Sequence, residues 1–273
     1  MSAAKSTASA PVEIASVALT VQDLPRVAKF YETLLGLNRL SSDTSTVRLG
    51  AGDTTLLELR GDKAARRSSP REAGLFHTAF LMPSRADLGA WLIHTAENRL
   101  PLQGASDHLV SEAIYLADPE GNGIEVYSDR PRLAWYNPDG SIKMATEGLD
   151  LSDVARSAKA PYKGAPEGLV VGHVHLQVGN VAEAEKFYQG VIGMPVTSHY
   201  PGAAFYGSGG YHHHIATNVW NSRNAGSRSY PATGLAEVAL RADAAEYAAI
   251  VARGGSDKLA DPWGTAITVA RKV

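Results

Sequence analysis

The hydrophobic positions near the start of the chain follow two periods in succession. Residues 17–21 alternate Val, Leu and Val with small or polar residues, which is the pattern of a strand buried on one face. Apolar residues then recur at intervals of three and four along residues 27–35, which predicts a helix with one face on a sheet. Asp23 is a good N-cap and Gly36 a good stop for this helix. The pattern therefore predicts one strand followed by one helix.

The same pattern returns in the second half of the chain. The segment from Val174 shares Val, Leu, Val, Lys-Phe-Tyr and a glycine with the segment from Val17, at matching places. Asn180 takes the N-cap position and Gly193 the stop position. Repeats of this kind indicate that one structural unit has been used more than once.

A fainter repeat lies between and after these two. Residues 74–97 and 234–255 each read as strand then helix, and each is followed by an Asp-Pro-x-Gly turn and a short strand. The chain thus divides into four units, each with one strand, one helix and two or three further short strands. The units start near Ile14, Gly74, Gly172 and Gly234.

This organisation predicts an α+β protein in two halves. Residues 1–12, rich in Ala and Ser, are expected to form a flexible leader. Residues 13–128 hold the first two units and residues 172–273 the last two. Residues 129–171, rich in Pro, Gly and Ala, are expected to be the linker between the halves.

Composition excludes several classes of function. The formal net charge of −2 gives no basic face for nucleic acid or a membrane surface. No apolar run reaches the roughly 18 residues of a membrane span. The chain has no cysteine, which removes disulfides, thiolate ligands and cysteine nucleophiles and fits a cytoplasmic protein. A homo-oligomer is compatible with these properties.

Four βαβββ modules resemble the vicinal-oxygen-chelate superfamily, which includes glyoxalase I, bleomycin-resistance proteins and type I extradiol dioxygenases. The resemblance covers nearly the whole chain after the leader. It implies two cupped, barrel-like sheets, each built from two modules. Some four-module members pair modules one with four and two with three, and we expect that arrangement here. The fold alone leaves the chemistry open, because this superfamily hosts several reactions.

The resemblance also implies where a metal would bind. The family takes its ligands from the first and last strands of two paired modules, and an Fe(II) oxygenase needs two imidazoles and one carboxylate. Modules two and three supply the complete set His77, His173 and Glu125. The other two neighbouring pairs are incomplete, with Ser16, Glu237 or Thr268 at ligand positions. The competing interpretation is that both histidines are polar strand residues in a closed barrel.

Residues 107–125 resemble the extradiol dioxygenase signature, with His108, Tyr115, Asp-Pro-x-Gly and the terminal Glu in order. Ser106 departs from the family pattern two residues before the histidine. The resemblance implies that His108 and Tyr115 hydrogen-bond and orient a bound catecholate. Further aromatic side chains are candidates for the pocket wall: Trp135, Tyr206 and Trp220.

Residues 211–218 resemble the His-His-x-aliphatic-Ala strand of the family, whose second histidine is the catalytic acid and base. Matched by position, that residue is His213. In a strand, His212 and His214 would point to the side opposite His213. The alternative is a surface histidine cluster.

The resemblance therefore implies an Fe(II)-dependent extradiol dioxygenase that cleaves a catechol-like aromatic diol with O2 to a muconic semialdehyde. His213 would accept the proton of the substrate hydroxyl and later return one. Mn(II), Zn(II) and Ni(II) are the alternative metals. A glyoxalase-like isomerase or lyase, in which Glu58 would matter, is the first competing hypothesis. The second is a protein that binds an aromatic drug without metal or catalysis.

Overall fold

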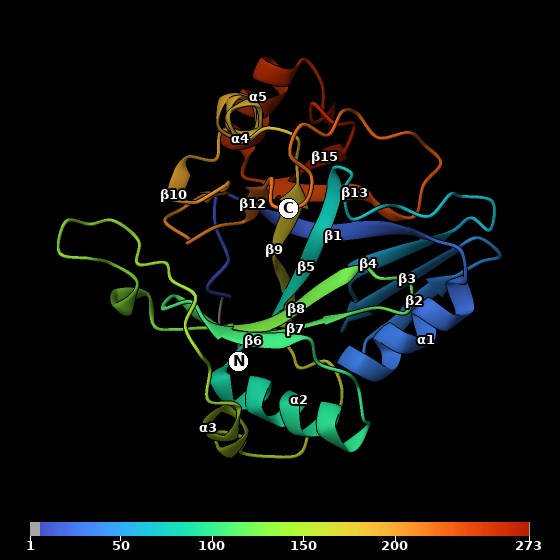
Figure 1. The fold of residues 1–273 in the computed structure, drawn as a ribbon, viewed down its shortest axis with the longest axis vertical. Helices are drawn as coiled ribbons and strands as arrows, with labels where there is room; N and C mark the ends of the chain where they lie inside the picture. The colour runs from blue at the N-terminus through green and yellow to red at the C-terminus, as the bar shows by residue number, and fades with distance from the viewer. Residues whose placement is uncertain (1–5, 273) are drawn as a thin grey trace.

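The computed structural model describes residues 6–272, which fold into two curled sheets flanked by short helices (Figure 1). The seven-stranded sheet has the order β14-β15-β13-β1-β4-β3-β2, and the eight-stranded sheet has the order β10-β11-β12-β9-β5-β8-β7-β6. The predicted α+β class with two cupped sheets is confirmed.

The first sheet contains β1 (Val12–Val21), β2 (Asn38–Ser42), β3 (Thr46–Ala51), β4 (Thr54–Gly61), β13 (Gly234–Ala242), β14 (Lys258–Ala260) and β15 (Ala266–Arg271). The second contains β5 (Gly74–Leu81), β6 (Gly104–Asp107), β7 (Ser111–Ala117), β8 (Gly123–Asp129), β9 (Val170–Gln177), β10 (Val196–Tyr200), β11 (Ala203–Tyr206) and β12 (Ile215–Asn218). The helices are α1 (Leu24–Leu35), α2 (Arg85–Glu97), η1 (Arg132–Ala134), α3 (Leu151–Arg156), α4 (Val181–Phe187), its continuation η2 (Tyr188–Ile192) and α5 (Ala244–Gly254).

The first strand of each module pairs with two other strands. It runs parallel to the last strand of its own module, in the pairs β1–β4, β5–β8, β9–β12 and β13–β15. It also runs antiparallel to the first strand of a second module, in the pairs β1–β13 and β5–β9. Modules one and four therefore share one sheet, and modules two and three share the other, as predicted. Over residues 6–272, the fourth module has two strands after its helix where the βαβββ pattern has three.

The helices form where the sequence places their caps. The side chain of Asp23 accepts a hydrogen bond from the backbone N–H of Arg26 (3.2 Å), and Gly36 ends α1 in the left-handed region with φ of 60°. This stop suits glycine, which has no Cβ to clash there. In Figure 1, α2 and α3 lie together beside β6 to β8, while α4 and α5 lie together at the opposite end of the molecule.

Both segments outside the four modules pack onto the protein. Residues 1–5 of the expected leader lie outside the described residues, but Ala8 and Ala10 are only 4% and 6% exposed. The carbonyl of Ala8 accepts a hydrogen bond from His214 Nε2 (2.8 Å), so this end of the leader is packed and not free. The segment between the halves pairs with the second sheet through two backbone hydrogen bonds between Asp107 and Glu147.

No helix within residues 6–272 combines the length and the apolar character that a membrane crossing requires.

We expect Gly172→Ala to destabilise the protein. A Cβ at Gly172 on β9 would lie 1.9 Å from the hydroxyl of Tyr127, which is fully buried and comes from β8, on the far side of β5. Overpacking of this kind costs about 1–3 kcal/mol of the free energy of unfolding. Chemical denaturation measures the loss. Gly104→Ala is the control, because a Cβ there meets nothing within 4 Å, and its effect is expected to stay within about 0.5 kcal/mol. Equal stability of both variants would contradict this packing.

Candidate metal centre

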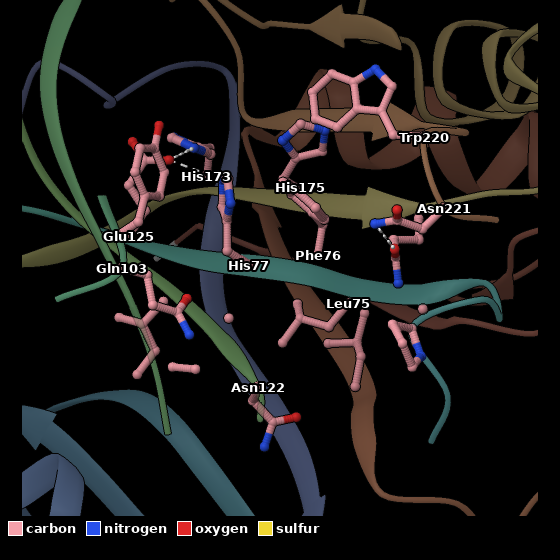
Figure 2. A pocket seen from close by; sticks show the side chains of 18 of the residues that line it. Leu75, Phe76, His77, Gln103, Asn122, Glu125, His173, His175, Trp220 and Asn221 are labelled. Carbon is pink, nitrogen blue, oxygen red and sulfur yellow. Dashed lines mark hydrogen bonds and ion pairs between the residues drawn. The ribbon is translucent and has the colours of Figure 1, made fainter. Parts of the chain in front are cut away.

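Three adjacent strands of the second sheet bring the predicted ligands together. Ala79 of β5 pairs with Glu125 of β8 on one side and with His173 of β9 on the other. His77 lies two residues before Ala79 and therefore on the same face. Strands are about 4.8 Å apart and the methyl of Ala79 is short, so the three longer side chains can meet above it. Figure 2 shows them converging at one end of the cavity.

The distances allow the three side chains to share one ion. One ligand atom from each of His77, Glu125 and His173 lies within 4.8 Å of the other two. Glu125 Oε2 is 2.9 Å from His77 Nε2 and 3.3 Å from His173 Nε2. All three residues are buried, with at most 6% of their surface exposed. Over residues 6–272 this is the one group of three or more such side chains with this geometry.

The surroundings hold the ligands in the charge states that bind a cation. Burial alone would raise the pKa of Glu125, but the adjacent His173 and His77 outweigh it and hold this pKa well below its usual range. Burial lowers the pKa of His173 to about 4, against the opposing effect of Glu125. At neutral pH the carboxylate is therefore ionised and the His173 imidazole neutral. Both groups can bind a metal without first losing a proton.

One ligand nitrogen, His77 Nε2, has no hydrogen-bond partner among the described residues. His77 Nε2 is enclosed and makes no hydrogen bond within the described part of the chain, although a carboxylate oxygen is 2.9 Å away. A buried polar atom without a partner is costly. Two imidazoles and one carboxylate are the donor set of a non-haem Fe(II) centre, and Mn(II) and Zn(II) also accept these donors. The residues present therefore fit a divalent cation.

A cavity of about 700 Å³ adjoins these ligands. The three predicted catalytic residues, His108, Tyr115 and His213, all line it. Its other walls include aromatic side chains and a stretch of the segment between the two halves: Phe76, Phe205, Trp220 and residues 144–146. Trp135 and Tyr206, expected as wall residues, do not line the cavity; both are fully buried elsewhere in the core.

His108 and Tyr115 form a hydrogen-bonded pair in the cavity wall. His108 Nδ1 is 2.7 Å from the carbonyl oxygen of Ala145, and His108 Nε2 is 2.6 Å from the hydroxyl of Tyr115. A carbonyl only accepts, so Nδ1 carries the proton, and Nε2 of the neutral ring accepts from Tyr115. Burial raises the pKa of Tyr115 well above its usual value, and the charge of Glu125 adds to this. Tyr115 therefore remains a phenol. The backbone carbonyl of Ala145 gives no signal in the sequence.

The structure corrects the expected geometry around His213. β12 begins at Ile215, so residues 211–214 precede the strand and do not alternate as strand residues do. His212 does not point away from His213; their Nδ1 atoms are 2.8 Å apart. His214 does point elsewhere, to the carbonyl of Ala8. Burial lowers the pKa of His213 well below its usual range, and His173 and His212 lower it further, so its neutral form is present at neutral pH.

His175 is a further imidazole on the cavity wall. It lies two residues after His173 on β9, and this spacing already places it on the cupped side of the sheet. Asn218 Nδ2 donates to His175 Nε2 (3.0 Å), so His175 Nδ1 carries the proton of the neutral ring. Burial lowers the pKa of His175 well below its usual range, which keeps the ring neutral.

Glu58 takes no part in this site. It lies on β4 in the other sheet, where its carboxylate pairs with Arg48 and Arg60, each at 2.7 Å. The expectation that Glu58 would matter in a glyoxalase-like site therefore fails on position.

We expect the purified protein to bind one divalent cation per chain. At a metal concentration a hundredfold above the Kd, binding adds about 2.7 kcal/mol to the free energy of unfolding, which thermal unfolding detects as a higher Tm. His77→Ala, His173→Ala and Glu125→Gln should each abolish this shift, because each removes one donor. Glu58→Gln is the matched control in the other sheet and should keep it. A full shift in any of the three ligand variants would refute the assignment.

Comparisons with known proteins agree with the fold and with the repeat. The profile of the Glyoxalase/Bleomycin resistance protein/Dioxygenase superfamily matches residues 13–126 and 170–266. A Bacillus subtilis (strain 168) protein named catechol-2,3-dioxygenase is 39% identical over 223 residues, which is 80% of this chain and 78% of the relative.

Solved structures show the same fold at low sequence identity. A putative dioxygenase from Bacillus subtilis subsp. subtilis str. 168 has a TM-score of 0.62 at 14% identity, over 98% of this chain and 86% of that chain. Glyoxalase I from Zea mays has a TM-score of 0.58 at 15% identity, over 94% and 92%. The profile match covers both halves of the chain, and the Bacillus relative covers four-fifths of it. On these grounds the chain belongs to the Glyoxalase/Bleomycin resistance protein/Dioxygenase superfamily.

Proposed function

We propose that this protein is an Fe(II)-dependent extradiol dioxygenase that cleaves the ring of a catechol-like aromatic diol with O2. The observation that carries the proposal is the meeting of His77, Glu125 and His173 at a cavity that also contains His213 and Tyr115. The name of the 39% identical Bacillus relative, catechol-2,3-dioxygenase, supports the same reaction.

The three ligands would hold the metal from one side. Two imidazole nitrogens and one carboxylate oxygen would supply three ligands to an ion and leave its other positions to small molecules in the cavity. When bound there, Fe(II) would supply the one-electron chemistry that O2 needs to react with a diol. Because the three ligands are buried, small molecules would reach them from the side of the cavity.

His213 would accept the proton of a substrate hydroxyl. Its ring centroid lies 4.2 Å from that of His173, so an atom next to the ligands is within its reach. The ring is neutral at neutral pH and can take up a proton when the diol binds. The same nitrogen can return that proton to the product.

The pair of His108 and Tyr115 would orient the diol. The Tyr115 hydroxyl donates a hydrogen bond to His108 Nε2, so its oxygen keeps a lone pair that can accept a hydrogen bond from a substrate hydroxyl. Tyr115 pairs directly with Glu125 across β7 and β8, which places this contact beside the ligands. Phe76 and Phe205 supply apolar walls for an aromatic ring and exclude water from it.

Two other functions are the alternatives. A glyoxalase-like isomerase or lyase would use Ni(II), Zn(II) or Mn(II) and commonly more carboxylate, but Glu125 is the one carboxylate of the ligand group. A binding protein without catalysis would not need the proton-transfer groups His213, His108 and Tyr115 in the cavity. Oxygen consumption separates the proposal from both alternatives, since neither an isomerase or lyase nor a binding protein uses O2.

We expect Fe(II)-loaded protein to consume O2 and to form a yellow ring-fission product with at least one catechol from a small panel. His77→Ala, His173→Ala and Glu125→Ala should abolish both signals, because each lacks a ligand. An oxygen electrode and visible absorbance measure them. Glu58→Gln should retain the wild-type rate. Undiminished turnover in any ligand variant would defeat the proposed site.

Replacement of His213 should slow the reaction while leaving the metal bound. We expect His213→Gln to lower kcat by about 10²–10⁴-fold, the usual contribution of a general acid and base. Metal content and Tm shift should match those of the wild type. The matched control is His199→Gln, since His199 is an exposed histidine on β10 that pairs with Glu185. A kcat within about threefold of wild type in His213→Gln would remove His213 from the mechanism.

A further inference from the structure

We propose that Asp129 and His212 are positioning residues for His213: together they fix the orientation of its ring and place its bare nitrogen, Nε2, toward the cavity. This inference rests on the proposed function, in which His213 accepts the proton of the substrate.

The three side chains form one chain of hydrogen bonds. His212 Nε2 lies 2.9 Å from Asp129 Oδ1, and His212 Nδ1 lies 2.8 Å from His213 Nδ1. Asp129 is the last residue of β8, and the two histidines lie just before β12, separated from it by His214. The side chains of Asp129 and His212 are 3% and 0% exposed, so water does not compete for these bonds.

Every described group that hydrogen-bonds the Asp129 carboxylate donates to it. Thr7 Oγ1 donates to Oδ2, and Tyr211 and His212 donate to Oδ1. The Tyr127 hydroxyl lies 2.7 Å from that of Tyr211 and extends this network along β8, which also carries Asp129. Because the carboxylate accepts, His212 Nε2 is the donor in this bond, and in the singly protonated ring this is the one N–H.

The position of this proton determines the others. With Nε2 protonated, Nδ1 of a neutral His212 is an acceptor, so the bond between the two rings requires the proton of His213 on Nδ1. Nε2 of His213 then carries a lone pair. It makes no hydrogen bond to any residue of the described chain, and His213 lines the cavity. The network therefore selects the tautomer that can accept a proton from a bound substrate.

Packing also fixes the orientation of the His212 ring. The His212 ring packs against both Tyr211 and Trp135, at centroid distances of 4.1 Å and 4.9 Å. Neither Asp129 nor His212 lines the cavity, so neither contacts a substrate there. Their effect on the reaction must pass through His213, which separates them from residues that bind the diol.

Nitrogen-15 NMR of the metal-free protein tests the tautomer directly, because protonated and bare imidazole nitrogens have well-separated shifts. We expect one His213 tautomer in the wild type, with the proton on Nδ1 and Nε2 bare. The His213 signals are assigned as those that disappear from the spectrum of His213→Gln. In Asp129→Asn the side-chain amide can donate to His212, so we expect the proton of His213 to redistribute toward Nε2. A wild-type proton on Nε2, or an unchanged distribution in Asp129→Asn, would overturn the inference.

Kinetics of the Fe(II)-loaded protein give the second readout. Asp129→Asn and His212→Phe should each lower kcat at least about tenfold while KM stays within about threefold, since neither residue touches substrate. His212→Asn should recover most of the loss, because its amide oxygen offers an acceptor near the place of Nδ1. The matched control is His199→Asn, in the exposed pair of His199 Nε2 and Glu185 Oε1 at 2.8 Å, and its kcat should not change.

The two experiments separate this inference from the proposed function. If no catechol is turned over by any form of the protein, the dioxygenase proposal fails, and the NMR result still decides the tautomer. Equal kcat in His212→Asn and His212→Phe, or a loss that falls on KM alone, would show that the network serves folding only and would overturn the inference.

Discussion

The candidate site depends first on the antiparallel pairing of β5 with β9. It joins modules that lie on either side of the segment from residue 129 to 171, and it sets His173 directly across from Ala79. The alternation of side chains along a strand makes this register unforgiving, because a slip of one residue would turn His173 to the opposite face. The parallel pairing of β5 with β8 then adds Glu125 in the same row. The site is thus a property of three strands in register and of no single module.

The two sheets show how one architecture can carry different contents. In the first sheet, Arg60 bridges Glu58 and Glu237 at 2.7 Å and 2.8 Å, and Arg48 pairs with Glu58 at 2.7 Å, so the charges of these side chains balance. In the second sheet, the equivalent positions leave a carboxylate facing imidazoles. The backbone plan is shared, while the chemistry follows from a few side chains on its inner face.

The repeat could be predicted from the sequence, because period-two alternation tells which residues share a face. The module pairing and the grouping of His77, Glu125 and His173 were expected from the family resemblance, and the structure brings these three side chains together. Prediction from the sequence failed where the backbone is not extended. Residues 211–214 precede β12, so alternation misplaced His212. The contact of His108 with Ala145 involves a backbone carbonyl, which any residue supplies. Trp135 is aromatic, as pocket-wall residues often are, but long-range packing buries it against Tyr211 and His212.

The division of the ligand group between distant parts of the chain has a consequence for biosynthesis. His77 and Glu125 emerge from the ribosome well before His173, and β5 cannot complete its sheet until β9 has been made. A growing chain therefore holds two donors at most until translation has passed the middle of the molecule. An ion bound at this candidate centre would accordingly be acquired late, together with the docking of the third module onto the second.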